Sequence, residues 1–154
     1  HAFAAGMEVP EANLLAFRES VCKVLPELNP DIKPGSRVFF ADSRIVAGEV
    51  NENTFETLQG LAPFGAGHTE PIFLLKNILV KEQKLLSGGK HIKFSLFDER
   101  FKFKKYSGLL WHKAADYPED YVDKKIDILF QFGKETRGFG CKFYLQIIDI
   151  KISE

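Results

Sequence analysis

The sequence predicts a mainly β chain with an N-terminal helix (α+β), whose strands form a small antiparallel β-barrel. From residue 72 onward, apolar residues recur with the period of two that is typical of strands. Before residue 30 they recur instead at the spacing of a helix. The 15 phenylalanines among 154 residues favour strands, and the 45% of hydrophobic residues is enough for a buried core.

The predicted helix spans residues 11–25, between Pro10 and Pro26. Its apolar face comprises Leu14, Leu15, Phe17, Val21, Val24 and Leu25. We expect Pro26 to end the helix. Residues 26–36 hold three prolines and a glycine, so we place a linker there and divide the chain into domains 1–30 and 31–154.

A short strand over residues 37–46 and a helix over 51–61, capped by Asn51 or Asn53, are expected next. They lead into residues 61–73, which contain two prolines and two glycines. Because proline fixes φ and glycine permits positive φ, this segment predicts a rigid loop that exposes backbone N–H groups. A plain connection between a helix and a strand is the alternative interpretation.

Alternation continues through the second half of the chain. Residues 72–80 are apolar on both faces, which indicates a central or covered strand, and residues 87–90 predict a hairpin turn. In the next strand we expect one set of side chains inside (Ile92, Phe94, Leu96) and another outside (His91, Lys93, Ser95). In the last strand, 141–152, the phase switches at Ile147–Ile148, which predicts a bulge at a barrel corner.

Residues 100–113 interleave basic and aromatic side chains. Cations that meet phosphates and rings that stack on bases are what a single strand of nucleic acid requires, and Tyr106 and Trp111 are the candidate stacking residues. The alternative is a half-buried strand with phenylalanine inside and lysine in solvent. The acidic loop 116–123 would repel nucleic acid, so a binding groove is expected elsewhere.

Charge and cysteine content narrow the class of protein. Basic and acidic residues number 21 each, so nucleic-acid binding requires a local patch. Cys22 and Cys141 form no redox or metal motif, which indicates a reduced, cytoplasmic setting. No apolar run reaches the ~20 residues of a membrane helix, so no membrane partner is expected.

Motifs of catalysis are missing from the sequence. None of the four histidines has a partner at metal-ligand spacing, and neither a G-x-S-x-G nor a P-loop pattern occurs. We therefore expect no catalytic residue, no metal ligand and no cofactor in this chain.

Five segments, in order, resemble the C-terminal region of RecJ-type single-stranded-DNA-specific exonucleases. They are HAFAAG (1–6), NLLAFRE (13–19), APFGAGHTEPIF (62–73), GGKHIKF (88–94) and LQIIDI (145–150). The first is similar to the end of the G-G-H-x-x-A-A-G motif of DHHA1 domains. The third is similar to the family's PFG-x-G-N-x-E-P-x-F signature, with His68 where the family usually has asparagine.

The resemblance implies that residues 1–30 are the end of a DHHA1-type substrate-binding domain and that 31–154 are an OB-like nucleic-acid-binding domain. It implies a chain that grips single-stranded DNA for a 5′→3′ exonuclease. The catalytic DHH domain, which holds Mn²⁺ or Mg²⁺ in that family, would lie upstream. Single-stranded DNA, that upstream domain and a single-strand-binding protein are the implied partners.

The resemblance and the charge pattern together select a set of candidate nucleic-acid-binding residues. They are His1, Phe64, Gly65, Gly67, Lys90, His91, Lys93, Lys102, Lys104, Tyr106 and Arg137. Two other functions stay open. The domain could be a protein-interaction or docking module of the same enzyme. It could also belong to another DHHA1-bearing protein, such as an alanyl-tRNA-synthetase-like editing enzyme, although the downstream segments argue against this.

Overall fold

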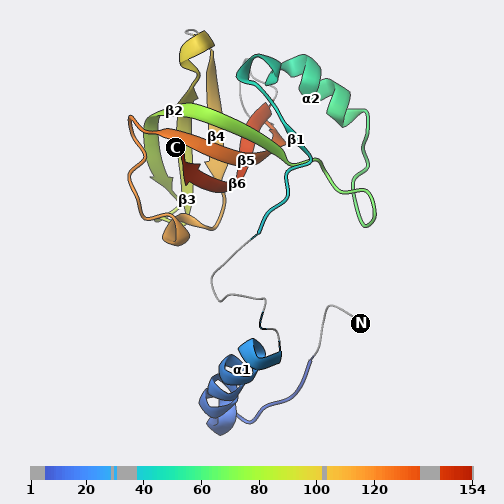
Figure 1. Ribbon diagram of the computed structural model, residues 1–154, viewed down its shortest axis with the longest axis vertical. Coiled ribbons are helices and arrows are strands. Elements are labelled where there is room, and N and C mark those ends of the chain that lie inside the picture. The colour runs from blue at the N-terminus through green and yellow to red at the C-terminus, as the bar shows by residue number, and fades with distance from the viewer. Residues whose placement is uncertain (1–5, 29, 31–37, 102–103, 136–142, 154) are drawn as a thin grey trace. The chain divides into compact units, whose positions relative to one another are not determined.

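The computed structural model describes residues 6–28, 30, 38–101, 104–135 and 143–153 (Figure 1). The chain divides into two compact units, residues 1–39 and 40–154. The first unit contains helix α1 (Leu14–Leu28), preceded by a 3₁₀ turn at Glu11–Asn13. The predicted helix is therefore confirmed, but it does not end at Pro26. Pro26 lies within the last turn, where it removes one backbone N–H donor, and the helix continues to Leu28.

The second unit is a closed barrel with one helix, α2 (Glu52–Gln59). Its strands are β1 (Ser43–Arg44), β2 (Phe73–Leu86), β3 (His91–Phe97), β4 (Lys105–Leu110), β5 (Lys125–Lys134) and β6 (Phe143–Ile152). The order is β2-β3-β4-β6-β5, and β5 pairs again with β2. The pairing is mostly antiparallel, with a parallel contact between β4 and β6. This five-stranded closed barrel confirms the predicted mainly β, OB-like fold.

Inward-facing side chains from all five barrel strands fill the interior. Ile92, Phe94 and Leu96 are fully buried, as the alternation predicts. Phe55 of α2 stacks on Phe143 with ring centroids 5.6 Å apart, so α2 closes one side of the same core. Figure 1 shows α2 beside the barrel.

Three register shifts bend the barrel strands: one in β6, one in β2 opposite β5, and one in β2 opposite β3, between Val80 and Glu82. In β6, Phe130 pairs with Ile147 and Leu129 with Asp149, which leaves Ile148 as the extra residue. The bulge predicted at Ile147–Ile148 is thus confirmed. In β2 the register shifts between Leu75 and Ile78, where Asn77 has a φ of 57°. The simple alternation expected for residues 72–80 is wrong here because this bulge moves Ile78, Leu79 and Val80 all to buried positions.

The strand expected over residues 37–46 shrinks to the two residues of β1. Val38 and Phe40 are exposed, Phe40 by 82%, so their alternation does not mark a buried face. Residues 42–45 instead run parallel to the start of β2, where Asp42 N–H donates to the Ile72 carbonyl and Ile45 N–H to the Leu74 carbonyl. Helix α2 begins after Asn51, whose side chain accepts the Thr54 N–H, as the capping prediction requires.

Candidate nucleic-acid interface

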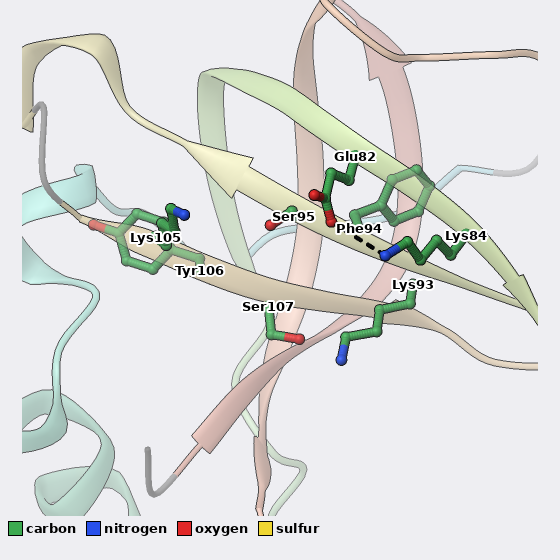
Figure 2. A pocket seen from close by; sticks show the side chains of 8 residues that line it. All are labelled: Glu82, Lys84, Lys93, Phe94, Ser95, Lys105, Tyr106 and Ser107. Carbon is green, nitrogen blue, oxygen red and sulfur yellow. Dashed lines mark ion pairs between the residues drawn. The ribbon is translucent and has the colours of Figure 1, made fainter. Parts of the chain in front are cut away.

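A groove of about 360 Å³ crosses the outer face of β2, β3 and β4. We call it the outer-face groove; it is lined by Glu82, Lys84, Lys93, Phe94, Ser95, Lys105, Tyr106 and Ser107. Figure 2 shows the lysine, serine and glutamate side chains lying over the three adjacent strands. Strand alternation places them outside because Phe94, Leu96 and Tyr106 between them point into the core.

The strand register brings two lysines side by side in this groove. Lys84 of β2 is the cross-strand partner of Lys93 of β3. Like charges directly opposite one another destabilise a sheet. Glu82 relieves part of this repulsion, since its Oε2 lies 3.6 Å from the Lys84 Nζ. A bound anion over Lys84 and Lys93 would relieve the remaining repulsion between them.

One carboxylate and two hydroxyls occupy the middle of the groove. Glu82, Ser95 and Ser107 lie in one cross-strand row, because Glu82 pairs with Ser95 and Ser95 with Ser107. Lys105 lies on the other side of this row, with its Nζ 5.8 Å from the centre of the Phe97 ring. The groove therefore presents ammonium groups on both sides of two hydroxyls and a carboxylate.

An aromatic cluster lies at the start of β3 and the end of β4. The His91 ring contacts the rings of Trp111 and His112, with centroids 4.8 and 4.4 Å apart. Trp111 keeps 38% of its surface exposed. His112 has a φ of 55°, and its N–H donates to Nδ1 of His91 at 2.9 Å. The partly exposed indole is thus held in place by a buried imidazole.

The expectation that His91 projects outward is wrong. Its exposed fraction is only 7%, because the end of β4 packs over it. This desolvation, together with the nearby charges of His112 and Lys90, lowers the pKa of His91. A neutral imidazole that already accepts a backbone N–H is a structural group. Lys93 does lie in the outer-face groove, and Lys90 lies exposed in the adjoining hairpin.

Tyr106 is also turned inward, with 5% of its surface exposed. Its hydroxyl donates to the Ala47 carbonyl at 2.5 Å. Burial, with a smaller effect of the Asp98 charge, raises the pKa of Tyr106 to about 12. Its ring cannot stack on a base, so that prediction is wrong. Lys104 is half-buried and its Nζ lies 3.5 Å from the Gly48 carbonyl, outside the outer-face groove.

The Pro63–Pro71 loop closes on itself. Gly65 and His68 exchange two backbone hydrogen bonds, of 2.8 and 3.1 Å, across a turn in which Gly67 has a φ of 79°. The Gly65 N–H is therefore not a free anion donor, contrary to expectation. His68 Nε2 is 2.9 Å from the Leu61 carbonyl, and its ring contacts Phe64 with centroids 5.2 Å apart. Phe64 and His68 thus hold the loop together.

Three of the predicted residues, His1, Lys102 and Arg137, lie outside the described residues. Within the basic–aromatic segment 100–113, strand β4 begins at Lys105, and Glu99–Phe101 form a 3₁₀ turn. Arg100 pairs with buried Asp98 at 2.7 Å. Arg100 therefore does not belong to the outer face of β4.

Sequence reasoning did not select six of the groove residues as candidates: Glu82, Lys84, Phe94, Ser95, Lys105 and Ser107. For Glu82 and Lys84 the available signal was the run of polar residues 81–84 after Val80, where β2 continues to Leu86. Among the described residues, no group of three or more His, Cys, Asp or Glu side chains could hold a metal ion. Within the same part of the chain, no helix is long and apolar enough to cross a membrane.

Comparison with known protein families identifies the family of this chain. The model of the RecJ OB domain matches residues 41–149, which is well over half of the chain. The chain belongs to the RecJ OB domain family. The match covers barrel strands β2 to β5 and β6 up to residue 149, and it includes all three strands of the outer-face groove. No curated protein matches the chain.

Solved structures show the same fold. RecJ from Thermus thermophilus in complex with Mn²⁺ matches 97% of this chain at 21% identity and a TM-score of 0.59, over 20% of its own length. The Mg²⁺ complex matches 95% at 21% identity and a TM-score of 0.57, over 21% of its length. A putative aspartyl-tRNA synthetase from Leishmania major Friedlin matches 87% at 9% identity and a TM-score of 0.51, over 26% of its length. The chain thus spans about a fifth of the RecJ chains.

Proposed function

We propose that this RecJ OB domain binds single-stranded DNA in the outer-face groove and grips it for a RecJ-like 5′→3′ exonuclease. The observation that carries the proposal is the pairing of Lys84 with Lys93 on adjacent strands, with Lys105 across the same groove. OB folds bind oligonucleotides on the face formed by their second and third strands, which are β3 and β4 here. A DNA phosphate over the two lysines would neutralise their repulsion.

Trp111 is the residue we propose for base stacking. Its indole is partly exposed and lies one position beyond the end of β4, beside the first residue of β3. Contact with the buried His91 ring limits the freedom that the indole would lose on binding. Stacking on an aromatic ring stabilises a bound single strand by about 1–3 kcal/mol per base. Replacing Trp111 by alanine should therefore weaken binding about fivefold or more.

The catalytic step belongs, in this proposal, to another domain of the parent enzyme. The two RecJ structures similar to this chain were solved with Mn²⁺ and Mg²⁺. We propose that the parent uses such an ion for phosphodiester hydrolysis, in an upstream catalytic domain that also contacts this chain. A single-strand-binding protein is a further proposed partner.

The test is a fluorescence-anisotropy titration with labelled single-stranded DNA at several salt concentrations. Three lysine–phosphate contacts should give a plot of log affinity against log salt with a slope of about −2. Lys81→Gln is the control, because Lys81 pairs with Asp123 and lies outside the groove. Absence of binding at low salt, or binding that ignores salt, contradicts the proposal.

A protein-docking role is the second candidate, and helix α1 favours it. One face of α1 carries several exposed apolar side chains: Leu14, Phe17, Val24, Leu25 and Leu28. Large exposed apolar faces commonly mark interaction sites. We propose that residues 6–28, as the end of a DHHA1-type domain, pack through this face against the rest of that domain. The two roles use different units of the chain, so they are compatible.

A further inference from the structure

The outer-face groove contains one negatively charged side chain, Glu82, in a place where phosphate binding alone would favour none. We propose that Glu82 and Ser95 read the edge of one DNA base in this groove and favour bases that carry an amino group over thymine. The inference rests on the proposed single-stranded DNA binding and adds a base preference to it.

The position of the pair supports this role. Glu82 and Ser95 are direct cross-strand partners on the outer face, so their Cβ atoms lie about 4.5–5.5 Å apart. The Glu82 side chain is 63% exposed. Its contact with Lys84 is long and exposed, and such ion pairs hold a carboxylate only weakly. The carboxylate is thus accessible to a ligand in the groove (Figure 2).

The flanking charges suggest which part of DNA reaches Glu82. Lys84 and Lys93 lie on one side of the Glu82–Ser95–Ser107 row, and Lys105 lies on the other. Successive outward positions on a strand are about 6.8 Å apart. Phosphates held by the lysines would therefore lie to either side of this row. A base between two phosphates could then meet Glu82, whose charge would repel a phosphate at the same place.

The donor and acceptor pattern of the pair selects the base. A carboxylate only accepts hydrogen bonds, while a serine hydroxyl can also donate one. Cytosine offers an amino group next to an acceptor nitrogen, and adenine offers the same combination, so either base can satisfy both side chains. In the pose that cytosine takes, thymine places its O4 carbonyl, an acceptor, against the Glu82 carboxylate, while its N3–H faces the Ser95 hydroxyl, so only the serine contact is kept.

The experiment compares oligo(dC), oligo(dT) and oligo(dU), each of about 16 nucleotides, which is the upper site size of an OB fold. Mildly alkaline pH keeps cytosine unprotonated. We expect oligo(dC) to bind about fivefold more tightly than oligo(dT), the lower end for one two-point base contact. Oligo(dU) should behave like oligo(dT), since both present the same edge and differ only in the methyl group.

The variant Glu82→Gln should bring the dC/dT ratio close to one, because an amide can turn to donate or accept. It should also strengthen binding of both oligonucleotides, since a negative charge is removed. Asp123→Asn is the matched control: Asp123 also pairs with a lysine of β2, at 3.1 Å, but lies outside the groove. Asparagine tolerates the φ of 60° at this position. The control should keep the wild-type ratio.

Two results would overturn the inference. If wild-type protein binds both oligonucleotides with the expected salt dependence but without preference for oligo(dC), the base reading is wrong and the proposed function stands. If the wild type prefers oligo(dC) but Glu82→Gln keeps that preference, the base reading by Glu82 is also wrong and the proposed function also stands. If neither oligonucleotide binds at low salt, the proposed function fails and the base preference fails with it.

Discussion

The hydroxyl of Tyr106 donates a hydrogen bond to the backbone carbonyl of Ala47, which lies 59 residues earlier in the chain. Both residues are buried. The bond ties β4 to the segment between β1 and α2, so the Tyr106 side chain has a structural role inside the barrel.

Replacing Tyr106 by phenylalanine should lower the free energy of unfolding by about 1–2 kcal/mol, because the Ala47 carbonyl loses its buried partner. Affinity for single-stranded DNA should stay unchanged. Urea denaturation and an anisotropy titration measure the two quantities. A variant of normal stability that loses DNA affinity would show instead that the tyrosine contacts DNA.

His91 should make the stability of the barrel depend on pH. Burial, helped by the charges of His112 and Lys90, lowers the pKa of His91 in the folded state below its ordinary value of 6.5. As pH falls below this value, His91 is protonated in the unfolded chain but stays neutral in the folded chain. The free energy of unfolding is expected to decrease from about pH 7 to about pH 5.

His91→Asn provides the check, because asparagine can still accept the His112 N–H but does not titrate. Urea denaturation across this pH range should give a shallower pH dependence for the variant than for the wild type. Carboxylates titrate in both proteins, so the difference isolates His91. Identical slopes in the two proteins would contradict the assignment.

The two glycines of the Pro63–Pro71 loop should differ in their tolerance of a side chain. Gly67 has a φ of 79°, so Gly67→Ala should cost about 1–2 kcal/mol of stability. A Cβ on Gly65 would meet no heavy atom within 4 Å, and Gly65→Ala should be nearly neutral. Thermal unfolding of both variants tests this contrast. Equal losses would mean that the turn geometry described above does not hold in solution.

Lys93 should contribute to DNA affinity through its charge. Removal of one phosphate contact in Lys93→Gln should weaken binding at low salt and reduce the magnitude of the salt slope by about 0.7. Lys93→Glu should weaken binding further. Anisotropy titrations at several salt concentrations measure both effects, with Lys81→Gln as the control of equal charge change. If the Lys93 and Lys81 variants weaken DNA binding equally, the DNA does not bind in the outer-face groove.

Local patterns in the sequence were sufficient for much of the fold. Asn51 caps α2, residues 87–90 turn the hairpin, and the phase switch at Ile147–Ile148 marks a real bulge. Capping, turn formation and side-chain alternation depend on neighbours within a few residues, so the sequence displays them directly. The ordered motifs that indicated a RecJ-type protein are of the same local kind.

The candidate site depended on the tertiary structure. His91 and Lys93 alternate alike in sequence, yet the end of β4 covers His91 and leaves Lys93 in the groove. Lys84, which no motif marked, lies opposite Lys93 because of the β2–β3 register. Which strand lies beside an outward residue, and what covers it, is determined by contacts between residues far apart in the chain. The sequence alone therefore determined the family and the barrel, while folding decided which cations share one surface.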